Sequence, residues 1–208
     1  FKINSESPGL MAKACADIQI PFLHISTDSV FCGSGVSPWK TDDIPSPLSI
    51  YGKSKLQGEL NTIENGKLFA IIRTSWLFSS TGNNFVKAIL EHKGDDIRVV
   101  SDQIGAPTSA FSLAEAVYKV AKSINSTNCG IYHYCGYPYV TWSDFAKEIF
   151  SKLEKNKKVI PIKTSEYLSL AKRPLNARLD CEKIDRIFSI KKSYWRFDLE
   201  KVLKNLEI

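Results

Sequence analysis

The 208-residue sequence predicts an α/β protein with a doubly wound parallel sheet and a smaller C-terminal α/β lobe. Two short apolar runs, 22–28 and 68–74, end in small polar residues. Buried parallel strands have this character where their carboxyl ends open into a ligand site. A helix expected over 7–18 leads into the first strand, and a helix expected over 53–63 precedes the second. Strands and helices therefore alternate, as in a parallel α/β sheet.

The remaining elements follow in chain order. Residues 36–48 are rich in Pro, Ser and Asp and are expected to form a loop. Thr141 is the expected N-cap of a helix with Asp144 at its third position. His133 alternates with two tyrosines and is predicted to pack in the sheet rather than to act in catalysis. Helices are also expected over 84–92, 111–123 and near 199–206, strands over 97–100, 130–134 and 159–162, and a loop over 102–108.

Composition places few restrictions on the ligand. With 43% hydrophobic and 24% charged residues, the chain is an ordinary globular sequence, and its net charge of +6 suits anions such as nucleotide phosphates. The lysine run at 155–158 lacks aromatic or arginine interleaving, so we expect a solvated loop and no nucleic-acid partner. No apolar run is long enough for a bilayer and no signal peptide is recognisable, so we expect no membrane association and a cytoplasmic location.

The five cysteines are odd in number and show no Cys-x-x-Cys spacing. This pattern is typical of reduced thiols in a cytosolic protein and indicates neither a metal site nor a disulfide framework.

Tyr51 and Lys55 are four residues apart on an expected helix and therefore share one face. A nearby ammonium stabilises a phenolate, which would lower the pKa of the tyrosine and let it exchange a proton near neutral pH. Two surface residues of an amphipathic helix would show the same spacing, so the pair alone does not decide. The upstream strand, however, ends in the hydroxyls of Ser26 and Thr27. These hydroxyls, the tyrosine and the lysine together could bind a carbonyl oxygen and protonate it while a hydride reaches the carbon.

Several segments resemble the dTDP-4-dehydrorhamnose reductase family of the extended short-chain dehydrogenases/reductases. The resemblance covers nearly the whole chain in order, and the series is more specific than any one segment. The segments are Ser26–Phe31, Tyr51–Glu59, Arg73–Trp76, Gly82–Phe85, Asp102–Thr108 and Arg173–Asp180.

The resemblance implies a partial Rossmann-like fold and the NADPH- or NADH-dependent reduction of the 4-keto group of dTDP-4-dehydro-L-rhamnose, a nucleotide sugar. By resemblance, Thr27, Tyr51 and Lys55 would be catalytic, and Tyr51 and Lys55 would also contact the cofactor. Thr27, Asp28 and Trp76 would bind the substrate, although Trp76 could instead be a core tryptophan. The 102–108 loop would either lie beside the substrate or have a purely structural role. No metal is implied, and a homodimer is possible.

The implied division assigns 1–80 and 103–134 to the cofactor-binding domain, and 81–102 and 135–208 to a substrate-binding lobe. No glycine-rich phosphate loop is present; the nearest candidate, Gly33-Ser34-Gly35, is interpreted as a turn because no helix follows it. We therefore expect a C-terminal portion of a reductase that is inactive alone.

Two observations widen the possible functions. The family usually has tyrosine where this chain has Ser29, which leaves UDP-linked and other deoxysugars open as substrates. The block Arg173–Cys181 is also similar to one in the regulatory subunit of methionine adenosyltransferase, which shares the fold and is a binding partner, not a reductase.

Overall fold

The computed structural model describes residues 1–154, 157–168 and 171–206, so two residues of the lysine run, 155–156, lie outside the described part. The main sheet has three parallel strands in the order β1 (Phe22–Thr27), β2 (Phe69–Thr74) and β7 (Gly130–His133). Thr27 pairs with Thr74, so the carboxyl ends of β1 and β2 are level. All three strands lie where the sequence predicts them.

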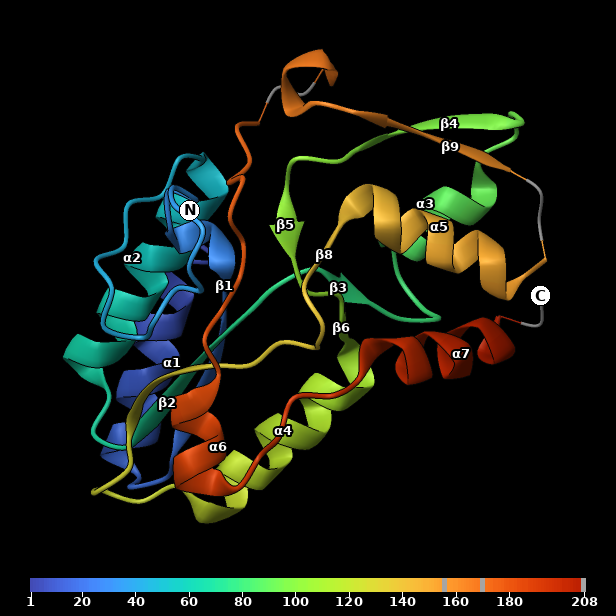
Figure 1. Ribbon diagram of the computed structural model, residues 1–208. Helices are drawn as coiled ribbons and strands as arrows, with labels where there is room; N and C mark the ends of the chain where they lie inside the picture. The colour runs from blue at the N-terminus through green and yellow to red at the C-terminus, as the bar shows by residue number, and fades with distance from the viewer. Residues whose placement is uncertain (155–156, 169–170, 207–208) are drawn as a thin grey trace.

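Helices cover both faces of this sheet (Figure 1). On one side lie α1 (Glu6–Asp17) and α2 (Ile50–Asn65), and on the other lie α4 (Ala110–Ser123) and α6 (Glu182–Phe188). The apolar stripe of α4 packs into the same core as the strands, as predicted; this core includes Ala70, Ile72, Leu113, Val120 and Tyr132. The predicted α/β architecture with a parallel sheet is confirmed, whereas α6 was not expected.

The first turn of α2 lies against the end of β1. Ser49 caps the helix, and its hydroxyl accepts a hydrogen bond from Gly52 N at 3.0 Å. A Cβ on Gly52 would lie 2.2 Å from the Ser29 carbonyl oxygen, so only glycine permits this approach. Ser29 belongs to a 3₁₀ turn, η1 (Asp28–Val30), that directly follows β1. The close contact therefore sets Tyr51 beside the carboxyl end of the sheet.

A second hydrophobic core lies under α3 (Phe85–Glu91), α5 (Trp142–Lys152) and α7 (Trp195–Asn205), with β4 (Asp96–Val100) paired parallel to β9 (Lys158–Ile162). Thr141 caps α5 as predicted. Helix α7 begins four residues before its predicted start because Trp195 is fully buried and donates from Nε1 to the Pro138 carbonyl at 2.8 Å.

The prediction of a loop over 102–108 is partly wrong, because this segment contains short strands. β5 (Ile104–Gly105) pairs antiparallel with β8 (Val140–Thr141), and β6 (Thr108–Ser109) pairs parallel with β3 (Leu77–Phe78). A short 3₁₀ turn, η2 (Thr164–Glu166), was also not expected. Two-residue strands are too short to show the alternation from which strands are predicted.

Within the described ranges, no helix is long and apolar enough to span a membrane. Nor does that part of the chain contain three or more His, Cys, Asp or Glu side chains grouped as metal ligands. All five cysteines are free thiols, and the sulfur atoms of Cys135 and Cys181 lie 3.6 Å apart in the core.

Candidate active site

The site begins at the carboxyl end of β1, where two buried polar side chains are tied together. Thr27 Oγ1 donates to Asp28 Oδ1 at 2.9 Å and accepts from the backbone N–H of Ser29 at 3.1 Å. The Ser29 hydroxyl also lies 3.4 Å from Asp28 Oδ1. These bonds cap η1 and fix the Thr27 hydroxyl at the strand end.

Helix α2 brings Tyr51 and Lys55 to the same place. Tyr51 is 52% exposed, so its hydroxyl is within reach of a ligand. Lys55 is half-buried, and its Nζ donates to the Ile25 carbonyl of β1 at 2.5 Å. The Thr27 side chain lies close enough to Tyr51 for hydrogen bonding with it to lower the pKa of the phenol. The structure thus brings together the residues that the resemblance names as catalytic.

The electrostatics differ from the expectation that Lys55 lowers the pKa of Tyr51. Burial raises the pKa of Tyr51, the hydrogen bond with Thr27 opposes this, and the negative charge of Asp28 adds to the rise. Burial also lowers the pKa of Lys55, against the charge of Glu59. Here the ammonium is directed at the Ile25 carbonyl, so it does not offset the burial of the phenol.

Asp28 is the most strongly perturbed carboxyl group at the site. Burial raises its pKa from 3.8 to about 6, although the hydrogen bonds from Thr27 and Ser29 act in the opposite direction. A carboxyl group with this pKa can carry a proton near neutral pH.

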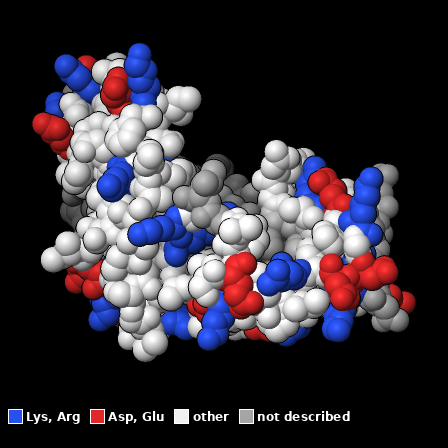
Figure 2. Space-filling model, turned by 90° about the horizontal axis from the view of Figure 1, so that it is seen from above, with Lys and Arg blue, Asp and Glu red and all other residues white. Residues whose placement is uncertain are grey.

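A cleft of about 710 Å³ opens beside these residues. On the face shown in Figure 2, Lys and Arg side chains gather beside a hollow between two raised parts of the molecule. The cleft is lined by the end of β1, the start of α2, two tryptophans and a basic segment near the C-terminal lobe. The lining residues are Asp28, Ser29, Leu48, Ser49, Ile50, Tyr51, Trp76, Gln103, Trp142, Ala171, Lys172, Arg173, Pro174 and Ala177.

Trp76 lines the cleft and is only half-buried, which answers the alternative that it is a core residue. It follows the end of β2 in a left-handed conformation, φ +47°, which costs free energy for a residue with a Cβ. Its indole stacks on that of Trp142 with ring centroids 3.6 Å apart and planes 12° from parallel. A Cβ added to Gly105 would lie 2.6 Å from Trp76 Cε2, so the indole rests on this glycine.

Sequence reasoning missed Trp142 and the basic pair Lys172 and Arg173 as cleft residues. The Arg-Pro dipeptide was noticed only as part of a motif, and its location depends on a contact far along the chain. Gly33 has φ +73°, and a Cβ there would lie 2.3 Å from Pro174 Cβ. This approach carries the basic segment to the loop after β1. Gly33 and Gly35 both have positive φ, +73° and +71°, and the chain bends over 35–37 with no helix directly after it.

His133 is fully buried, as predicted, and lies within 3.1 Å of the Trp39 carbonyl through Nδ1. Burial, followed by the charge of Arg73, lowers its pKa to about 3, so it is neutral in the fold.

Comparison with known proteins agrees with this geometry. A family model described as the RmlD substrate binding domain matches residues 1–208. The dTDP-4-dehydrorhamnose reductase of Sinorhizobium fredii is 38% identical over 205 residues, which cover 94% of this chain and 69% of that protein. The reductase of the same name from Aggregatibacter actinomycetemcomitans is 39% identical over 217 residues, covering 99% of this chain and 72% of that protein.

Solved structures show the same relationship. The dTDP-4-dehydrorhamnose reductase of Clostridium acetobutylicum matches 99% of this chain and 72% of its own with a TM-score of 0.92 and 34% identity. The Bacillus anthracis reductase, solved in complex with NADP, matches 97% of this chain and 72% of its own with a TM-score of 0.90 and 31% identity. This chain therefore belongs to the dTDP-4-dehydrorhamnose reductase family of oxidoreductases.

Proposed function

We propose that the full-length protein reduces the 4-keto group of dTDP-4-dehydro-L-rhamnose with NADPH, giving dTDP-L-rhamnose, and that these 208 residues alone are inactive. One observation carries the proposal: Tyr51 at the start of α2 and Thr27 at the carboxyl end of β1 are neighbours at the edge where the cleft opens. Open α/β sheets bind ligands at this edge. The names of the relatives and the NADP bound to one of them supply the substrate and the cofactor.

The residues at the strand end fit the nicotinamide end of the cofactor. A ribose diol needs hydrogen-bond donors and acceptors, and Lys55 offers an ammonium while Tyr51 offers a hydroxyl. The Lys55 ammonium already bonds to a single carbonyl, Ile25 O, which leaves further donors on the same nitrogen. When bound, NADPH supplies the hydride.

In this proposal Tyr51 is the general acid that gives its proton to the substrate oxygen. The pKa of Tyr51 is raised, which keeps the phenol protonated before the reaction. Thr27 orients that phenol through its hydroxyl and is itself held by Asp28 and by Ser29 N. The chain thus supplies a proton at a fixed atom and holds the carbonyl oxygen near it.

The cleft lining supports the substrate assignments. Asp28 can accept a hydrogen bond from a sugar hydroxyl, and Trp76 provides an apolar surface beside it. Lys172 and Arg173 place two positive charges in the same cleft, where a diphosphate would be bound. We assign the cofactor-binding part to 1–80 and 103–134 and the substrate lobe to 81–102 and 135–208, although α6 within the last range packs on the main sheet.

The test is the Tyr51→Phe variant of the full-length protein, assayed by NADPH oxidation with dTDP-4-dehydro-L-rhamnose. Turnover should fall at least about a hundredfold, because a positioned acid contributes about two to four orders of magnitude. Tyr118→Phe is the matched control, since Tyr118 is 64% exposed on α4 and does not line the cleft. A Tyr51→Phe rate close to that of wild type would refute the role of this residue.

A further inference from the structure

Trp142 is a cleft residue whose indole stacks almost face to face on Trp76. The Phe85 ring also packs on Trp142, with ring centroids 4.5 Å apart and an interplanar angle of 48°. Aromatic pairs in structures usually prefer offset or edge-to-face arrangements at larger separations, so this stack depends on its surroundings. The residues around the two indoles must therefore hold them in this face-to-face arrangement.

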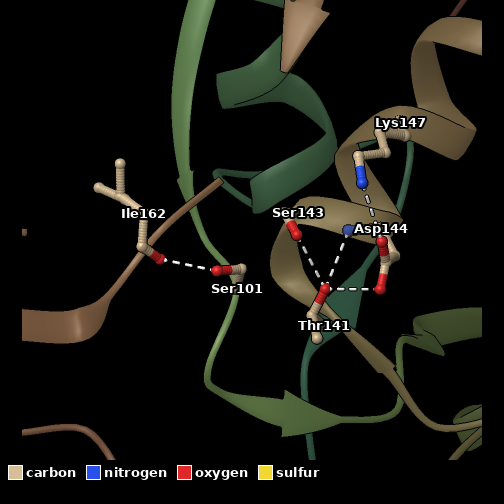
Figure 3. A network of polar contacts seen from close by, with 6 residues as sticks. All are labelled: Ser101, Thr141, Ser143, Asp144, Lys147 and Ile162. Carbon is tan, nitrogen blue, oxygen red and sulfur yellow. Dashed lines mark hydrogen bonds and ion pairs between the residues drawn. The ribbon is translucent and has the colours of Figure 1, made fainter. Parts of the chain in front are cut away.

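The position of Trp142 is fixed by the start of α5, of which it is the first residue. Figure 3 shows the Thr141 hydroxyl at the centre of the cap, where it accepts from Asp144 N at 3.1 Å. The same hydroxyl contacts Ser143 Oγ at 2.9 Å and Asp144 Oδ2 at 2.7 Å, and Lys147 pairs with Asp144 at 3.2 Å. The cap satisfies a backbone N–H of the first turn of α5 and so fixes the backbone at Trp142.

The strand pair β5–β8 sets Trp142 against Trp76. Residues 104–105 pair with 140–141, which places the end of β8 beside Gly105. The same glycine carries the Trp76 indole, because a Cβ there would overlap it at 2.6 Å. The backbone N–H of Thr108 also donates to the Trp76 carbonyl at 3.1 Å. Both indoles are consequently held by the segment 104–108 and by each other.

The stacked pair lies at the reacting end of the cleft. Thr27 and Thr74 are paired in the sheet, and Trp76 follows Thr74 by two residues. The indoles therefore lie near the strand edge that also holds the Thr27 and Tyr51 hydroxyls. A ligand whose carbonyl is reduced there must bring its sugar ring, and not its nucleobase, to this edge.

We propose that Trp142 is a second aromatic residue of the substrate site, which fixes the Trp76 indole and with it determines which sugar ring the cleft accepts. The inference rests on the proposed function and deepens it. The apolar C–H faces of a sugar pack against indole rings, and a rigid pair of indoles discriminates ring shape better than one freely rotating ring.

The test is calorimetric titration of dTDP-L-rhamnose and of dTDP into the 208-residue protein and its Trp142→Leu variant. The affinity for dTDP-L-rhamnose should fall about tenfold, the scale of one lost aromatic contact, while that for dTDP should change less than about twofold. Trp142→Phe should restore part of the loss because it keeps a ring in the stack. A urea-denaturation transition with the cooperativity of wild type checks that each variant is folded.

Phe85→Leu is the matched control, because Phe85 packs on Trp142 but does not line the cleft. We expect both of its affinities to stay within about twofold of wild type. An equal loss for dTDP and dTDP-L-rhamnose in Trp142→Leu would assign the pair to the base and overturn the inference. Unchanged affinities in that variant would overturn it too while leaving the proposed reduction intact. A wild-type protein that binds neither compound would remove the proposed function as well.

Discussion

A buried ion pair connects the helix that carries Tyr51 to the central strand of the sheet. The guanidinium of Arg73 donates to Glu59 through Nε at 2.9 Å and through Nη2 at 2.6 Å. Both side chains are at most 2% exposed. Glu59 lies one turn after Lys55 on α2, so the pair fixes the same face of the helix that presents Tyr51 and Lys55.

Removing one charge should be costly because the other stays buried. In Glu59→Gln the Arg73 guanidinium keeps its charge and loses its counter-ion, which predicts a loss of about 3 to 5 kcal/mol in the free energy of unfolding. Two features prevent the Arg73 charge from being compensated in another way. Among the residues that the structure describes, Arg73 Nη1 has no hydrogen-bond partner, and the guanidinium lies 5.0 Å from the centroid of the Phe31 ring. In the described part of the chain, Glu59 is therefore the only carboxylate paired with Arg73, and the Phe31 ring is its other neighbour of note.

The measurement is urea denaturation followed by far-ultraviolet circular dichroism, for wild type, Glu59→Gln and the double variant Glu59→Leu/Arg73→Met. The double variant removes both charges and fills the space with apolar atoms, so it should lose at least about 2 kcal/mol less than Glu59→Gln. A loss below about 1 kcal/mol in Glu59→Gln, no more than that of an ordinary hydrogen bond, would refute the reasoning.

Variants at three further positions, Asp28, Gly58 and Thr141, are compared with wild type by urea denaturation. The pKa of Asp28 is raised from 3.8 to about 6, so its stabilising contribution is complete below about pH 3.8 and is lost as the pH rises through about 6. Asp28→Asn should remove this dependence, changing the wild-type-minus-variant difference by at most about 3 kcal/mol between those limits; a constant difference would contradict the shift. Gly58→Ala should cost about 1 to 3 kcal/mol because its Cβ would lie 2.0 Å from the Asn4 carbonyl oxygen, and an unchanged midpoint would contradict that contact. Thr141→Ala should cost about 1 kcal/mol through the lost cap of α5, whereas Thr141→Ser should retain most of it.

Elements with a strong local pattern could be predicted from the sequence. The strands β1 and β2 are apolar runs with polar ends, and α4 and α5 carry regular apolar stripes. The meeting of Thr27, Tyr51 and Lys55 could also be anticipated, because the end of a strand and the start of the next helix lie on the same edge of a parallel sheet.

The rest of the site depends on contacts that leave no local pattern. The strands that bring Trp142 to Trp76 are two residues long, and the basic segment is held at the cleft by contacts far apart in sequence, such as the close approach of Gly33 to Pro174. The direction of the pKa shift at Tyr51 was missed for a related reason. Spacing on a helix shows that Lys55 is near, but it does not show that the Ile25 carbonyl holds the ammonium and that burial outweighs its charge.

One face of α2 carries both the proposed catalytic residues and a residue that anchors the helix to the sheet. Positions 51, 55 and 59 recur every four residues and contact, in turn, the cleft, the backbone of β1 and the side chain of Arg73 on β2. A helix held only by apolar packing could slide or rotate along the sheet at modest cost, whereas directional bonds to two adjacent strands fix its rotation and its height. Because the Tyr51 hydroxyl must meet a carbonyl oxygen at hydrogen-bond distance, this rigidity is a requirement of the proposed proton transfer. Changes at Glu59 should therefore reduce turnover even where the protein remains folded.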